Sequence, residues 1–100
     1  MRVLLSQFVK TDMQEIGDYI ELDNPARATS FVQELKAVVL GLGQFPYIYR
    51  LRPDIGSDAR VAVHGQYVVL FRIDGDSVLV ERVVQGNRNL SSLPKPPTAI

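Results

Sequence analysis

Residues 67–85 read YVVLFRIDGDSVLVERVVQ, and this stretch decides the fold class of the chain. Both of its ends are rich in Val, Leu, Phe and Tyr, residue types that favour β-strands. Asp74-Gly75 lies between them and is a strong hairpin signal, because the favoured two-residue turn needs positive φ at its central positions. The stretch therefore predicts two antiparallel strands, over residues 67–73 and 77–85.

Shorter segments on the N-terminal side of this hairpin extend the predicted sheet. Residues 59–64 form a candidate strand, which Gly65-Gln66 joins to the hairpin as a tight turn. Residues 3–6 are a short apolar run that predicts one more strand. Pro, Gly and mixed polarity indicate that residues 47–58 are a connecting loop.

The apolar period changes from 2 to 3.6 between the first strand and that loop. Val9, Met13, Ile16 and Ile20 share one face of a predicted helix, and acidic residues fill the other face. Either of two caps fits its start: a capping box made by Thr11 and Gln14, or an earlier start capped by Ser6.

A second helix follows, with Asn24 as its N-cap, Pro25 at its first position and Gly43 as a plausible C-cap. Its apolar positions form a broad stripe over about four turns. They are Ala28, Phe31, Val32, Leu35, Val38, Val39 and Leu42. Because the connection to the preceding helix is short, the two helices are expected to pack antiparallel as a hairpin.

The predicted fold class is α+β, in the order β-α-α-β-β-β, with the helical hairpin packed on one face of a largely antiparallel sheet. The length and the lack of a linker predict one domain over residues 1–100. After Gly86 we expect one short helical turn and then an extended tail, about residues 94–100.

Composition excludes several classes of site. The chain has eleven basic and eleven acidic residues, no Cys and one His, so neither a thiolate metal site nor a Cys nucleophile is available. The zero net charge argues against a protein that holds nucleic acid by bulk electrostatics. It is a cancellation between an acidic first half, residues 1–48, and an Arg-rich second half. No secretory or membrane-spanning segment is recognisable, which favours the cytoplasm.

The order and spacing of short motifs from Val3 to about Leu93 resemble the RelE/ParE toxin superfamily. The motifs are Ile16-Gly17-Asp18-Tyr19-Ile20, Asp23-Asn24-Pro25-Ala26, Phe31-Val32, Leu35, Leu42-Gly43, Phe45-Pro46, Arg60, Tyr67-Val68-Val69, Phe71-Arg72-Ile73, Arg82-Val83-Val84, Gly86, Arg88 and Leu90. The resemblance implies a small bacterial toxin of a type II toxin–antitoxin module, neutralised in a hetero-oligomer by a ParD-like or related DNA-binding antitoxin. It implies no metal, cofactor, membrane or sequence-specific nucleic acid.

The superfamily has two main activities, and the resemblance alone does not choose between them. RelE-like members cleave mRNA on the ribosome and place a Tyr or His near the end of the last strand, where this chain has Val84-Gln85-Gly86. An endoribonuclease would have to use Arg60, His64, Arg72 and Arg82. ParE-like members bind and inhibit DNA gyrase without hydrolysis, and this non-enzymatic function is our leading hypothesis. An inactive toxin fold that only binds antitoxin is the third.

Two sets of contact residues follow from these hypotheses. For the target we expect Arg82, Arg88 and Leu90, although Leu90 and Leu93 could instead fold back onto the sheet. The apolar stripe of the second helix could leave part of its surface for the antitoxin or could be entirely core. The candidates there are Phe31, Val32, Val39 and Leu42.

Overall fold

A computed structural model describes residues 1–96 of the chain. The strands are β1 (Arg2–Leu5), β2 (Ala59–His64), β3 (Tyr67–Asp74) and β4 (Ser77–Gln85); the helices are α1 (Val9–Glu21), α2 (Pro25–Gly41) and the 3₁₀ turns η1 (Pro46–Ile48) and η2 (Leu90–Ser92). This order confirms the predicted β-α-α-β-β-β fold and the short helical turn in the tail. Of the predicted extended tail, residues 97–100 lie outside the described residues.

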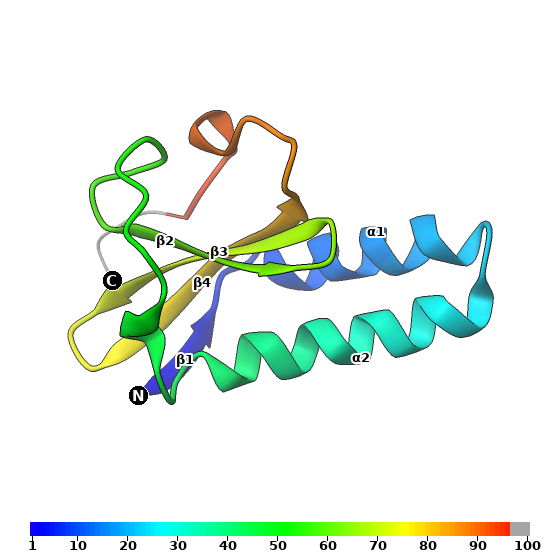
Figure 1. Cartoon of the computed structure of the whole chain (residues 1–100), viewed down its shortest axis with the longest axis horizontal. Helices are drawn as coiled ribbons and strands as arrows, with labels where there is room; N and C mark the ends of the chain where they lie inside the picture. Colours follow the sequence, from blue (N-terminus) through cyan, green and yellow to red (C-terminus); the bar gives the residue numbers. More distant parts are fainter. Residues whose placement is uncertain (97–100) are drawn as a thin grey trace.

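The sheet has the strand order β1-β4-β3-β2 (Figure 1). β2, β3 and β4 pair antiparallel as predicted, whereas β1 pairs parallel with β4. A parallel neighbour needs a crossover connection, and the helical hairpin is the first part of that connection. Between β3 and β4 the register slips, so Glu81 is an extra residue between Val80 and Arg82.

The two hairpin turns each place a glycine first. Gly65 has φ +59° and Gly75 has φ +62°, and among residues 1–96 no other residue type has positive φ. The central pair of the second turn is therefore Gly75-Asp76, and the expectation of positive φ at both central positions was wrong. Positive φ at the first position alone is typical of a type II′ turn, which glycine at that position favours.

The starts of the two helices test two predicted N-caps. α1 begins at Val9 and has no side-chain cap, so the predicted capping box is wrong; Ser6 Oγ instead accepts a hydrogen bond from Phe8 N, 3.1 Å away. α2 begins as predicted, with Asn24 Oδ1 accepting a hydrogen bond from Arg27 N at 3.1 Å.

Gly43 is not the C-cap of α2, because the helix already ends at Gly41. The glycine is instead required by packing: a Cβ there would overlap the carbonyl oxygen of Met1. The absence of a side chain therefore lets the segment after α2 pass against the start of β1.

The sheet buries both of its faces. α1 and α2 cover one face, while η2 and the residues before β2 lie over the other (Figure 1). The larger core cluster joins the helices to the sheet through Leu35, Val39, Val69 and Phe71, among others. The smaller cluster, on the opposite face, holds Ile55, Ala59, Val68, Leu70, Val84, Leu90 and Leu93. Among the described residues, no helix has the length and apolar character needed to cross a membrane.

Candidate functional site

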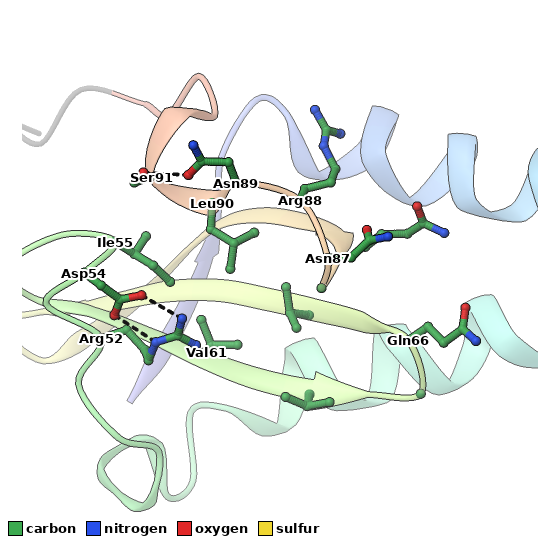
Figure 2. Close-up of a pocket in the computed structure, with 15 residues that line it drawn as sticks. Arg52, Asp54, Ile55, Val61, Gln66, Asn87, Arg88, Asn89, Leu90 and Ser91 are labelled. Carbon is green, nitrogen blue, oxygen red and sulfur yellow. Dashed lines mark hydrogen bonds and ion pairs between the residues drawn. The ribbon is translucent and has the colours of Figure 1, made fainter.

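A cleft of about 760 Å³ opens on the sheet face opposite the helices (Figure 2). Apolar side chains of β2, β3 and η2 form part of its lining, namely Val61, Val63, Val68 and Leu90, together with Ile55. Polar side chains complete it: Arg52, Asp54, Gln66, Gln85, Asn87, Arg88, Asn89 and Ser91. We call this hollow the sheet cleft.

Strand alternation and a glycine build the sheet cleft. Val61 and Val63 are two residues apart on β2, so their side chains point to the same face. Gly86 follows β4 and donates its N–H to the carbonyl of Gln66 at 2.9 Å, which fixes the last segment beside the β2–β3 turn. A Cβ at Gly86 would lie only 3.2 Å from a methyl carbon of Val68, so this approach favours glycine.

The polar groups of the sheet cleft are mostly uncharged. Arg52 and Asp54 pair through two hydrogen bonds, of 3.0 and 2.8 Å, and this pair lowers the pKa of the Asp54 carboxyl. Among the described residues, the lining contains amides, hydroxyl, guanidinium and this one carboxylate, but no imidazole or phenol. Such a surface donates and accepts hydrogen bonds but has no group poised to transfer a proton near neutral pH.

Arg82, predicted as a target contact, is instead a buried structural residue. Its Nε and one Nη each lie 2.8 Å from an oxygen of the Asp12 carboxylate on α1, and its other Nη donates to the Pro94 carbonyl at 2.8 Å. The guanidinium also lies 4.8 Å from the ring centroid of Phe8. The carboxylate raises the pKa of Arg82 further above its ordinary value. Arg82 therefore ties α1 to β4 and to the tail, and offers little surface to a partner.

The other two arginines of the predicted endoribonuclease set, Arg72 and Arg60, also make internal contacts. Arg72 is buried, and its Nε lies 3.3 Å from Glu81 Oε2, while burial raises the pKa of that carboxyl. Arg60 donates a hydrogen bond to the Tyr49 carbonyl and lies over the ring of Tyr47. Neither side chain lines the sheet cleft.

His64 faces the helices. Its Nε2 lies 2.7 Å from Glu34 Oε1, and its ring packs 5.2 Å from that of Phe31 on α2. Glu34 also binds Arg27, and these two partners lower the pKa of its carboxyl to about 2. The nominated His–Arg set is thus divided among separate pairs, because His64 binds Glu34 while Arg82 binds Asp12.

The remaining target candidates reach the sheet cleft. Arg88 is exposed at its rim, but Leu90 is only 7% exposed and belongs to the smaller core cluster together with Leu93. The alternative that these leucines fold back onto the sheet is therefore confirmed. Gln66, Asn87 and Asn89 also line the sheet cleft and were not predicted from the sequence. Their positions in the predicted turn after residue 64 and in the tail after Gly86 were the available signal.

A second hollow, also about 760 Å³, runs between α1 and α2; we call it the helix groove. Val32 and Val39 line it, as do Met13 and Gly17 of α1. Of the other antitoxin candidates, Phe31 and Leu42 are buried in the core and do not line the groove. The predicted stripe is thus divided, with only part of it facing outward.

Residues 3–90 match the family model described as the ParE toxin of the type II toxin–antitoxin system parDE. The chain belongs to the ParE toxin family. A curated relative of this ParE-family toxin, Toxin ParE3 of Caulobacter vibrioides, is 26% identical over 92 residues, which cover 91% of this chain and 92% of the relative. The resemblance to the RelE/ParE superfamily, and to its ParE-like branch, is confirmed.

Solved structures agree on the fold. A chain of the chromosomal ParDE system from P. aeruginosa superposes with a TM-score of 0.74 at 20% identity, covering 85% of this ParE-family toxin and 95% of that chain. A chain of the RelBE2 toxin–antitoxin complex from Mycobacterium tuberculosis gives 0.62 at 22% identity, covering 88% and 91%. A chain of a ParDE system and a chain of a RelBE complex thus share this architecture, so the activity has to be argued from the site.

Proposed function

We propose that this ParE-family toxin inhibits DNA gyrase by binding, without catalysing a reaction, and that it acts in the cytoplasm. The observation that carries the proposal is the sheet cleft, whose described lining can bind a partner but has no imidazole or phenol for proton transfer. The nominated arginines support the same conclusion, since Arg72 and Arg82 are buried in pairs with Glu81 and Asp12.

The supercoiling assay tests this proposal directly. Purified toxin is titrated against gyrase and relaxed plasmid, and inhibition of supercoiling or trapping of cleaved DNA is expected. In a translating extract the same toxin is expected to leave mRNA intact, whereas a RelE-like endoribonuclease would cleave it. Absence of any effect on gyrase at a large molar excess of toxin contradicts the proposal. Growth arrest on expression separates both activities from an inactive antitoxin ligand.

Arg88 is the target contact that this proposal retains from the sequence. It is exposed at the rim of the sheet cleft, where a guanidinium suits a carboxylate on the partner. Arg88→Glu is expected to raise the toxin concentration needed for half inhibition at least about tenfold. Arg50→Glu makes the same charge change at an exposed arginine outside the cleft and is expected to change it less than about twofold.

We propose in addition that a cognate antitoxin binds the helix groove. The solved structures that resemble this chain come from ParDE and RelBE toxin–antitoxin systems, which supports an antitoxin as partner. The groove offers half-buried Val32 and exposed Leu5 and Leu40 as apolar contacts, above a floor that includes the buried Val39 and Met13, and this surface fits the apolar face of a helix. Phe31 and Leu42 would contribute only by supporting α2 from the core.

Val32→Lys tests the groove, because Val32 is only half-buried and the charge can reach solvent. We expect this variant to lose antitoxin binding at least about tenfold while it still inhibits gyrase. Thr29→Lys, another substitution in the groove lining at an exposed residue, should have a smaller effect. Unchanged antitoxin affinity in Val32→Lys would place the antitoxin elsewhere.

A further inference from the structure

β2 is an edge strand, and only its first half is covered on the outer side. Leu51 bridges to Arg60, and Arg52 N donates to the Ala59 carbonyl at 2.7 Å. Past Arg60, no strand within residues 1–96 pairs with this side of β2. The second half of the edge therefore presents backbone groups that another chain can use.

The register identifies which backbone groups face outward. His64 pairs with Tyr67 across the two-residue turn, so the N–H and C=O of His64 and Ala62 are directed to β3. Alternation then directs the N–H and C=O of Val63 away from the sheet. The outward bond between Ala59 and Arg52 fits the same alternation, since Ala59 and Val63 are an even number of residues apart.

This half of the edge is short, but it lacks the charge, proline and bulge that commonly prevent strand addition. Val63 is β-branched and 70% exposed, and residues 61–63 contain no charge and no proline. Natural edge strands are commonly protected by Lys, Pro or a bulge. An exposed valine at an unpaired edge is instead a surface suited to a partner strand.

The sheet cleft lies directly beside this edge. Val61 and Val63 line it from β2, Gln66 lies at the β2–β3 turn, and Arg88 lies on the segment after β4, across the cleft from Val61 (Figure 2). A strand added to β2 would run about 5 Å from it and would direct every second side chain to the cleft side of the sheet. The volume of about 760 Å³ is large enough for several side chains of such a strand.

We infer that the sheet cleft and the free edge of β2 together bind an extended segment of the inhibited protein, which adds to the sheet as a fifth strand. The inference rests on the proposed function, because it assigns this segment to the protein that the toxin inhibits. Its cleft-facing side chains next to β2 are apolar, to cover Val61 and Val63, and past the end of β2 the segment crosses the cleft and places an acidic side chain near Arg88. Arg88 takes part in none of the ion pairs formed among the described residues.

A second copy of the chain is the poorer occupant. The free edge is only about three residues long, so any occupant gains few backbone hydrogen bonds around Val63 and needs the cleft for its other contacts. Of two copies paired through β2, each would leave its own cleft unfilled, because Val61 and Val63 face that cleft and not the partner. A separate extended segment can form hydrogen bonds with the free edge of β2 and also fill the sheet cleft.

Two substitutions at Val63 test the inference. Val63→Pro removes the outward N–H but leaves the hydrogen bonds between β2 and β3, and Val63→Lys adds an edge charge without changing the backbone. Val63→Thr keeps both the N–H and the β-branched shape. We expect the Pro and Lys variants to lose growth arrest and at least about tenfold in gyrase inhibition, while the Thr variant stays within about twofold. Antitoxin affinity and far-UV circular dichroism should be unchanged in all three.

The outcomes separate this inference from the proposed function. If the wild-type toxin inhibits gyrase and Val63→Lys inhibits it equally, strand addition is wrong and gyrase inhibition stands. If the wild type has no effect on gyrase, the proposed function fails, and growth arrest still reports whether the Val63 edge engages the actual target. Loss of antitoxin binding in the folded Lys variant would assign the segment to the antitoxin and overturn the inference. Leu22→Lys, at an exposed apolar residue in neither hollow, is the matched control.

Discussion

Removal of the Asp12 carboxylate is expected to cost this protein a large part of its stability. Asp12 and Arg82 are both at least nine-tenths buried and lie 70 positions apart in the sequence. The carboxylate accepts two hydrogen bonds from Arg82, each 2.8 Å long, and a third from the backbone N–H of Val83 at 3.0 Å. Asp12→Ala therefore leaves a buried guanidinium without its counter-ion and a buried N–H without its acceptor.

The size of the effect follows from these contacts. Breaking a buried ion pair by removing one partner typically costs about 3–5 kcal/mol. Arg82 keeps the Pro94 carbonyl and the Phe8 ring, which offset part of that cost, so we expect about 3 kcal/mol. A domain of 100 residues has a free energy of unfolding of about 5–15 kcal/mol, so the change is a substantial fraction of it.

Urea unfolding followed by circular dichroism measures this change, with Asp18→Ala as the control at an exposed carboxylate of the same helix. The control is expected to stay within about 0.5 kcal/mol of the wild type. Arg82→Met combined with Asp12→Ala should be less destabilising than the sum of the single variants, because the double variant leaves no unpaired charge. A loss below about 1 kcal/mol for Asp12→Ala, or strict additivity in the double variant, would refute the reasoning.

Two further predictions concern stability. The pKa of Glu34 is lowered to about 2 by Arg27 and His64, so its contribution to stability is present above the ordinary pKa of a glutamate and is lost as the pH falls toward 2. The difference in unfolding free energy between wild type and Glu34→Gln should therefore shrink as urea unfolding is repeated from pH 6 to pH 2, and a constant difference would contradict this. Gly43→Ala should cost about 1–3 kcal/mol because its Cβ would overlap backbone, whereas Gly41→Ala meets nothing within 4 Å in the last turn of α2 and should be neutral or stabilising. Thermal melts of the two alanine variants compare them directly, and equal shifts would count against the packing argument.

Local signals in the sequence were sufficient for most of the fold. Val, Phe and Leu runs separated by glycine turns predicted β2, β3 and β4, and the Asn24-Pro25 pair marked the start of α2. These features succeed because strand alternation, turn geometry and capping each depend on a few neighbouring residues. The parallel pairing of β1 with β4 depends on where the helical hairpin returns the chain, which no local pattern contains.

The site was harder to predict, because the roles of its arginines depend on distant partners. Arg82 has a buried carboxylate as its partner only because α1 packs against β4, and nothing near residue 82 in the sequence indicates Asp12. Likewise, the sequence around Leu90 is compatible with an exposed contact residue, whereas in the structure η2 places this side chain in the smaller core cluster. The sheet cleft itself combines side chains from four segments between Arg52 and Ser91, so its polar rim follows from the tertiary structure.

The distribution of charge explains how one scaffold can support inhibition by binding. The chain has as many acidic as basic residues, and two of the arginines pair with a carboxylate from another element: Arg82 with Asp12, and Arg72 with Glu81. Glu34 of α2 binds His64 of β2 and, within its own helix, Arg27. The pairs of Asp12 with Arg82 and of Glu34 with His64 stabilise the packing of the helices on the sheet, and the paired arginines are less available to a phosphate backbone. Arg88, in contrast, remains exposed at the rim of the sheet cleft. Under the proposed function, such a site with one exposed cation, amides and a nearby free edge suits an extended protein segment better than RNA.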